Sequence, residues 1–237
     1  MYSADSDDLF LAKLAEQVER YDDMTNQMKK VVEAKAGALS MEERNILSVA
    51  YKSVVGQRRA SLRCLKAAEQ TEVEKRTNNQ RHAKAYREKV EMELHNLCAS
   101  IIELLEGLLI PKAENAEAKV FFLKMKGDYN RYRAEVSSGD DNVAFVGLAS
   151  GAYDEAKSQA IESLTTTHPV RLGLALNHSV FKYEVEKKQE EACEIAKVAF
   201  DDAIADLDSI DQDTYKDATM IMQMLKDNLS IWQPEDD

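Results

Sequence analysis

Proline and glycine are scarce in this sequence, with only 3 Pro and 8 Gly among 237 residues. Their scarcity argues against an all-β protein, which needs many tight turns, and against long flexible linkers. Hydrophobic residues make up 44% and charged residues 31%, which is typical of a globular protein rather than a disordered one. The composition therefore favours helices, in a chain long enough to bury a substantial core.

Positive charge is also in deficit, because the formal net charge is −12 and the pI is near 4.9. Nucleic acid and anionic lipid both require a basic surface, so we expect no nucleic acid partner. The most apolar stretch, NLCASIIELLEGLLI, contains Glu103 and Glu106 and is too short to span a membrane, so no membrane insertion is expected. The first residues, MYSADSDDLF, do not resemble a signal peptide, and the 3 Cys form no disulfide framework. We therefore expect a cytoplasmic protein with reduced thiols.

Familiar catalytic and metal-binding motifs are missing as well. The 4 His form no H-E-x-x-H pair, and the sequence has no G-x-S-x-G elbow, P-loop or G-x-G-x-x-G motif. The acidic residues occur as ordinary solvated pairs such as Glu42 and Glu43. We therefore expect no enzyme, no metal ion and no cofactor.

The sequence does contain the periodicity and the start and stop signals of helices along its whole length. Apolar residues recur at intervals of three and four, as in Ile221, Leu225 and Leu229. The start signals are the capping-box pairs Ser40 with Glu43 and Thr77 with Gln80, and Pro169 after Thr167 or His168. These marks predict an all-α protein with about nine helices, two of them long, at about 41–72 and 78–110. No linker divides the chain, so we expect a single domain over residues 1–237, with a short acidic tail from about residue 233.

The stretch KMKGDYNRY, residues 124–132, is rich in basic residues for so acidic a chain. On a helix, Lys124, Asp128 and Arg131 share one face, and Tyr132 lies at its edge. Asp128 could hold a neighbouring cation in place, and the Arg131 guanidinium offers a fork of donors to an anion. The alternative is a solvated face with local ion pairs.

Two further patterns suggest a ligand-binding surface. Lys52 and Arg59 lie two turns apart on one helix face with Gly56 between them, which leaves either a gap for a ligand or room for a closely packed helix. Asn177 and Asn228 each lie on an otherwise apolar helix face. Each is either an ordinary partly exposed or internally bonded amide, or a group that holds the main chain of a ligand.

Five segments together resemble the 14-3-3 family, over about residues 8–233. They are KLAEQVERYDDM, EERNILSVAYKSVVGQRRAS, KVFFLKMKGDYNRY, THPVRLGLALN and YKDATMIMQMLKDNLSIW. The resemblance implies nine antiparallel helices in a cup-shaped protomer with an amphipathic groove, dimerising through the N-terminal helices. It also implies an adaptor, and not an enzyme, that clamps, masks or bridges client proteins at phosphoserine or phosphothreonine.

The resemblance assigns roles to residues of this chain. The phosphate pocket comprises Lys52, Arg59, Arg131 and Tyr132, with Lys124 beside it. The residues assigned to the main chain of the ligand are Asn177, Asn228 and Glu184. The apolar wall of the groove comprises Leu176, Val180, Met224 and Ile231. The dimer interface comprises Leu14, Val18, Arg20, Asp23, Ser61, Leu65, Tyr86, Lys89 and Glu93, with ion pairs expected between Arg20 and Glu93 and between Asp23 and Lys89 of different subunits.

Ser61 is also a possible regulatory phosphorylation site, because the sequence RRAS at 58–61 suits a basophilic kinase. A phosphate in the dimer contact would favour separate subunits. The alternative is that Ser61 is simply a small residue that allows close packing.

Some positions depart from the family pattern. Asn130 precedes Arg131 and should point away from a phosphate. His178 and Lys182 replace residues that are usually aromatic, and Lys182 would add a cation near the groove. Gly147 and Gly151 should weaken the helix expected at about 141–164.

Two other classes of protein compete with the adaptor. A helical scaffold would bind unphosphorylated partner helices and would be indifferent to a phosphatase, whereas the adaptor would lose its partners. An enzyme is the third possibility, and the lack of a nucleophile–base pair counts against it. The sequence does not identify the clients, the kinases, or whether homodimers or heterodimers form.

Overall fold

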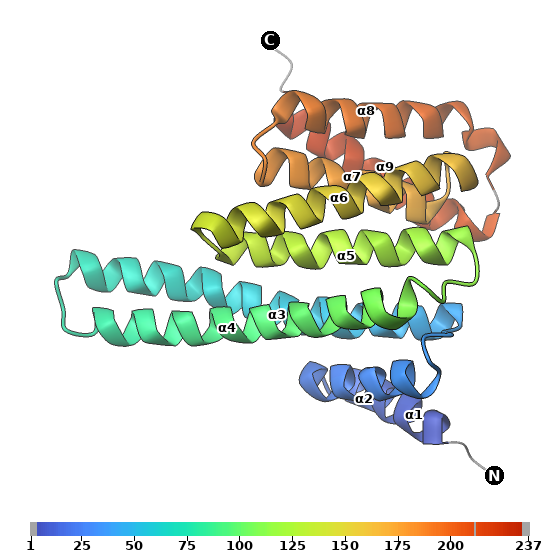
Figure 1. The fold of residues 1–237 in the computed structure, drawn as a ribbon. Coiled ribbons are helices and arrows are strands. Elements are labelled where there is room, and N and C mark those ends of the chain that lie inside the picture. The colour runs from blue at the N-terminus through green and yellow to red at the C-terminus, as the bar shows by residue number, and fades with distance from the viewer. Residues whose placement is uncertain (1–3, 211, 234–237) are drawn as a thin grey trace. The chain divides into compact units, whose positions relative to one another are not determined.

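The computed structural model describes residues 4–210 and 212–233, and this part of the chain contains nine α-helices and no strand (Figure 1). The helices are α1 (Ala4–Gln17), α2 (Tyr21–Ala34), α3 (Met41–Glu74), α4 (Gln80–Leu104), α5 (Ala116–Val136), α6 (Gly139–Ser163), α7 (Pro169–Glu184), α8 (Gln189–Ala205) and α9 (Gln212–Trp232). A π-helical turn, η1 (Leu105–Leu109), continues α4, and a 3-10 turn, η2 (Leu207–Ser209), follows α8. The predicted all-α class is confirmed. The acidic end of the tail, residues 234–237, lies outside the described residues.

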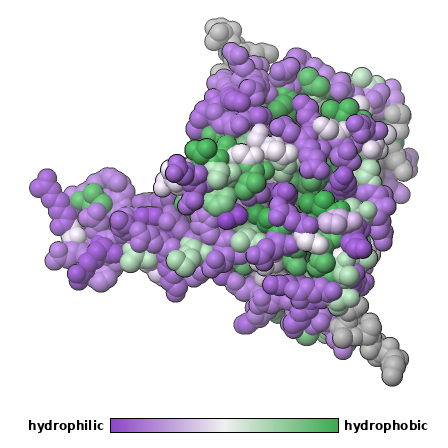
Figure 2. Space-filling model, viewed as in Figure 1, coloured by the Kyte–Doolittle hydropathy of each residue, from purple (hydrophilic) through white to green (hydrophobic). Residues whose placement is uncertain are grey.

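The chain forms two units, Met1–Lys112 and Ala113–Asp237, and each is described by itself. In the first unit α1 packs on α2, α2 on α3, and α3 on α4. Its core includes Met24, Leu47, Tyr51, Leu94 and Ile101, all of which are almost fully buried. Figure 2 shows mainly hydrophilic residues over the ends of α3 and α4 that meet at the turn between them. The expected single domain stays a prediction.

Local sequence explains where α3 and α7 begin. Ser40 caps α3 with a capping box, in which its Oγ accepts from the Glu43 N–H at 3.3 Å and the Glu43 carboxylate accepts from the Ser40 N–H at 2.9 Å. Pro169 lies in the first turn of α7, directly after the N-cap residue His168. The second predicted capping box is wrong, because Asn79 precedes α4 and the Thr77 hydroxyl donates instead to the Glu72 carboxylate.

In the second unit α5 packs along α6, both contact α7, and α7 packs on α8 and α9. Gly127 allows α5 and α6 to approach closely, since a Cβ at that position would lie 2.7 Å from Cε1 of Tyr153. Further along, α6 runs unbroken through Gly147 and Gly151. The buried residues shared by α7, α8 and α9 include Leu172, Ala192, Cys193, Ala196, Met222, Leu225 and Trp232.

Candidate functional site

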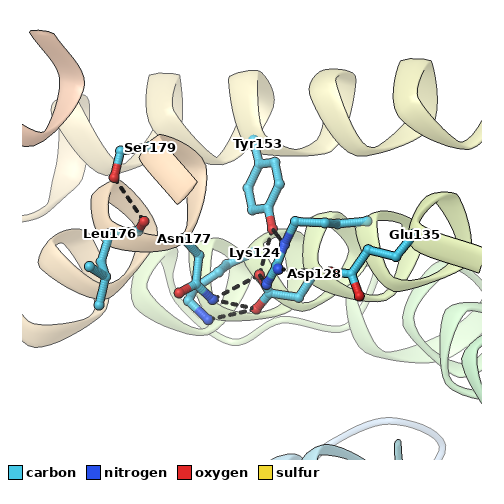
Figure 3. A network of polar contacts seen from close by, with 8 residues as sticks. Lys124, Asp128, Glu135, Tyr153, Leu176, Asn177 and Ser179 are labelled. Carbon is cyan, nitrogen blue, oxygen red and sulfur yellow. Dashed lines mark hydrogen bonds and ion pairs between the residues drawn. The ribbon is translucent and has the colours of Figure 1, made fainter. Parts of the chain in front are cut away.

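Several polar side chains of the second unit lie around the Asp128 carboxylate of α5 (Figure 3). Lys124, one turn earlier, donates from Nζ to Asp128 Oδ2 at 2.7 Å. The Nη2 atom of Arg131 lies 3.7 Å from Asp128 Oδ1. The expectation that Asp128 holds neighbouring cations on this helix face is therefore confirmed.

Two other helices add neutral donors to the same carboxylate. Tyr153 of α6 donates its hydroxyl to Asp128 Oδ1 at 2.6 Å and accepts a hydrogen bond from Arg131 Nε at 3.3 Å. Asn177 of α7 donates from Nδ2 to both carboxylate oxygens of Asp128, at 2.8 and 2.9 Å. Figure 3 shows Tyr153 and Asn177 reaching Asp128 from different helices. We call Lys124, Asp128, Arg131, Tyr153 and Asn177 the clasp cluster.

The clasp cluster is largely removed from solvent. Asp128 is 6% exposed, Arg131 5% and Tyr153 0%. The interpretation of this helix face as solvated is therefore wrong for Asp128 and Arg131. Burial alone would raise the pKa of Asp128, but the charges of Lys124 and Arg131 outweigh burial and hold that pKa below its ordinary value. The carboxylate is consequently ionised at neutral pH.

The surroundings of Tyr153 keep its hydroxyl protonated, so that it remains a hydrogen-bond donor. Burial, and then the negative charge of Asp128, raise the pKa of Tyr153 well above its ordinary value. The hydroxyl therefore keeps its proton and fixes the carboxylate on one side and the Arg131 guanidinium on the other. Sequence reasoning missed Tyr153, because it lies 25 residues from Asp128 and belongs to no recognisable motif.

Arg131 makes further contacts at the edge of the clasp cluster. Its Nη1 lies 3.3 Å from Glu135 Oε1, and its guanidinium carbon lies 4.6 Å from the centre of the Tyr132 ring. Two cations, Lys124 and Arg131, thus face two carboxylates, Asp128 and Glu135. The formal charges of these four side chains cancel, so an anion of charge −2 requires cations from elsewhere to be well compensated.

The remaining cations assigned to the phosphate pocket lie in the first unit. Lys52 is exposed and Arg59 is half-buried, both on α3. A Cβ built on Gly56, between them, meets no described atom of the first unit within 4 Å, so the choice between a gap for a ligand and room for a closely packed helix stays open. The structure brings Lys124 and Arg131 together within one unit, whereas their association with Lys52 and Arg59 stays a prediction.

The residues assigned to the groove lie on the neighbouring helices α7 and α9. On α7, Leu176, Val180 and Asn177 are half-buried and Glu184 is exposed. On α9, Met224 is 49% exposed and Ile231 70% exposed, and Asn228 is half-buried. Apolar side chains on two packed helices thus remain partly open to solvent.

Two of the departures from the family pattern, Asn130 and Lys182, bond to residues outside the clasp cluster. Asn130 is buried and donates from Nδ2 to the Lys126 carbonyl at 2.9 Å. Lys182 is a cation paired with carboxylates, and its effect on ligand preference stays a prediction. Its Nζ lies 2.6 Å from Glu186 Oε2 and 3.5 Å from Glu191 Oε2, on the side of α7 that faces α8.

The residues assigned to the dimer interface all lie in the first unit. The exposed apolar side chains are Leu14 (43%), Val18 (57%) and Tyr86 (57%). Ser61 and Lys89 are exposed and Leu65 is half-buried. Within the protomer Arg20 pairs with Asp23, and Glu93 accepts from Arg58 Nε at 3.2 Å, so the ion pairs between subunits stay predictions.

The described residues offer neither a cluster of metal ligands nor a membrane-spanning helix. There, no group of three or more His, Cys, Asp or Glu could hold a metal ion. Over the same ranges, 4–210 and 212–233, no helix is long and apolar enough to cross a membrane.

Known proteins resemble this chain over most of its length. A family model described as "14-3-3 protein" matches residues 11–233. "14-3-3-like protein 2" of Caenorhabditis elegans is 57% identical, over 93% of this chain and 88% of that protein. "14-3-3 protein beta/alpha" of Homo sapiens is 53% identical, over 94% of this chain and 90% of that protein. The chain therefore belongs to the 14-3-3 family, and it is an adaptor that binds other proteins rather than an enzyme.

Proposed function

We propose that this adaptor binds its client proteins at phosphoserine or phosphothreonine residues. The observation that carries the proposal is the buried Arg131, which Asp128 and Tyr153 hold in one orientation. A guanidinium fixed in this way loses little entropy when it binds, and its planar fork matches two oxygens of a phosphate.

Charge balance supports a role for cations outside the second unit. A phosphorylated side chain carries about −1.5 to −2 charges at pH 7. The clasp cluster and Glu135 together have no net formal charge, as described above. The resemblance supplies the missing cations as Lys52 and Arg59 on α3, with a hydroxyl donor from Tyr132. We infer that these three residues and Arg131 bind the phosphate, with Lys124 as neighbour.

The groove would hold the rest of the client segment. The Asn177 amide nitrogen already donates to Asp128, whereas its Oδ1 accepts no hydrogen bond within the described residues. That oxygen can accept from a client main-chain N–H, and Asn228 and Glu184 would take similar roles. The half-open Leu176, Val180, Met224 and Ile231 would contact apolar client side chains.

Dimerisation would allow one adaptor to bridge two phosphorylated sites. The exposed Leu14, Val18 and Tyr86 offer apolar surface for burial, and the ion pairs would set the register, since exposed pairs contribute only about 0–1 kcal/mol each. Homodimers and heterodimers with a related chain both fit this surface. A cytoplasmic location suits the free cysteines of the described residues, and the mechanism requires no cofactor.

The test is calorimetry of a phosphoserine peptide with wild type and with Arg131→Ala. Hydrogen bonds to charged groups contribute about 1.5–3 kcal/mol each, so the substitution should weaken binding about 100-fold. Arg59→Ala should have a similar effect. The matched control is Arg133→Ala on the same helix, whose guanidinium stacks on Phe145 at 3.8 Å and which should bind within threefold of wild type.

Two results would contradict the proposal. One is folded Arg131→Ala and Arg59→Ala proteins that both bind the peptide within twofold of wild type. The other is equal binding of the unphosphorylated peptide, which would favour the helical scaffold that binds unmodified helices.

A further inference from the structure

A cavity of about 510 Å³ lies between α6, α7 and α8, within the second unit. None of the residues assigned above to the phosphate, the groove or the dimer lines it. Its walls are largely apolar, with contributions from Ile161, Leu174, Ala175, Ile195 and Val198. Ile161 is 56% exposed and Val198 53% exposed. The volume falls in the range of about 300–1,000 Å³ that is typical of small-molecule sites.

His178 of α7 is the unusual group in this cavity. Its side chain is 2% exposed, and neither ring nitrogen has a hydrogen-bond partner among the described residues. Buried polar side chains are nearly always bonded, so two unpartnered nitrogens on one ring call for an explanation. The nearest polar group is Asp154, whose Oδ1 lies 3.8 Å from His178 Nε2, which is too far for a hydrogen bond.

The ring of His178 is held in place by aromatic neighbours. It stacks on Tyr153 at 5.2 Å between ring centres, with an interplanar angle of 12°. The hydroxyl of Tyr153 bonds to Asp128 and Arg131, so His178 connects the cavity that it lines to the clasp cluster. The Asp154 side chain is 62% exposed, and it can rotate away to open Nε2 to an occupant of the cavity.

The charges around the cavity favour an uncharged occupant. Burial lowers the pKa of His178 to about 4, so the ring is neutral at pH 7 and has one donor nitrogen and one acceptor nitrogen. The charged lining groups are nearly balanced in sign; they are Asp154, Glu191, Glu194 and Asp202 against Lys157, Arg171 and Lys182. Lys182 already pairs with Glu186 and Glu191, and Arg171 donates to the Leu164 carbonyl at 2.9 Å.

We propose that this cavity is a second ligand site, which binds a small uncharged molecule with an apolar body and one amide or hydroxyl group. The apolar body packs against Ile161, Leu174 and Val198. The polar group forms a hydrogen bond with a ring nitrogen of His178, which has no hydrogen-bond partner among the described residues. A charged ligand would lose its hydration in a largely apolar cavity whose lining charges nearly cancel, so the site discriminates against ions.

The experiment is NMR of the full chain with ¹⁵N-labelled histidine, titrated with benzamide. We expect saturable shifts of the His178 ring nitrogens at millimolar benzamide, with the other three histidine side chains unaffected. Benzoate and benzylammonium, which have nearly the same body and opposite charges, should bind at least about tenfold more weakly, as expected when a charge is desolvated without a partner.

Two variants locate the site. His178→Phe keeps an aromatic ring on Tyr153 but removes both nitrogens, and it should lose about tenfold in benzamide affinity, measured on the NMR signals of benzamide itself because the reporting ring is gone. Val198→Trp places a bulky ring at an exposed wall position, so it should fold normally and abolish binding. Val198→Trp should keep the phosphopeptide affinity of wild type, which separates this site from the phosphate pocket.

The proposal is overturned by absence of saturable shifts at His178, by benzamide binding that survives both substitutions, or by tighter binding of benzoate than of benzamide. None of these outcomes bears on phosphopeptide binding, which is measured separately.

Discussion

Replacing Tyr153 with Phe removes the hydroxyl that bonds to both Asp128 and Arg131, and it keeps the ring that packs on Gly127 and His178. Two hydrogen bonds disappear, at 2.6 Å to Asp128 and at 3.3 Å from Arg131 Nε. Asp128 keeps its bonds from Lys124 and Asn177, whereas the buried Arg131 Nε loses its neutral acceptor. Since hydrogen bonds to charged groups contribute about 1.5–3 kcal/mol each, and Asp128 is partly compensated, the free energy of unfolding should fall by about 2–4 kcal/mol.

Urea unfolding at one fixed protein concentration measures this loss, since any self-association would shift the apparent stability. The matched control is Tyr183→Phe, because Tyr183 stacks on Trp232 at 4.7 Å and its hydroxyl has no hydrogen bond within the described residues. It should change the stability by less than about 0.5 kcal/mol. A loss in Tyr153→Phe as small as that of the control would refute the role assigned to the hydroxyl.

Three other predictions concern packing, pH and assembly. Gly127→Ala should destabilise the protein by about 1–3 kcal/mol in thermal unfolding, because the new Cβ would overlap the Tyr153 ring. Gly147→Ala is the control, and it should be neutral or stabilising because the space around Gly147 is open. The pKa of His178 falls from 6.5 to about 4 on folding, so the unfolded chain takes up the proton first. The contribution of His178 to the free energy of unfolding should be constant above pH 6.5 and should fall by about 3 kcal/mol as the pH drops from 6.5 to 4. His178→Phe should abolish that fall. The same pH dependence of unfolding in wild type and His178→Phe would contradict the prediction. Ser61→Glu should shift the protein toward monomer and remove the roughly 10²–10⁴-fold advantage of a two-site phosphopeptide, and light scattering that shows a full dimer at sub-micromolar concentration would count against it.

Much of the secondary structure follows from the sequence alone, because helix signals act between residues that are close in the chain. Ser40 and Glu43 satisfy each other's backbone donors whatever the rest of the molecule does. The spacing of Lys124, Asp128 and Arg131 likewise predicts their ion pairs, since one helix turn brings them together. Thr77 shows the limit of this reasoning, because its hydroxyl finds a competing acceptor, Glu72, in the preceding helix.

Other features depend on which helices pack together and in which register. Spacing along α5 predicts that Asp128 and Arg131 share a face, but their burial and the third partner, Tyr153, follow from the packing of α6 against Gly127. The same packing decides that His178 lies beside a cavity between three helices and that its nitrogens have no partner in the described part of the chain. No periodicity carries this information, because a helical pattern specifies which face is buried but not which side chain from a distant helix will meet it. The helices and their charged faces were thus determined locally, whereas the buried polar network and the cavity behind it were decided by tertiary contacts.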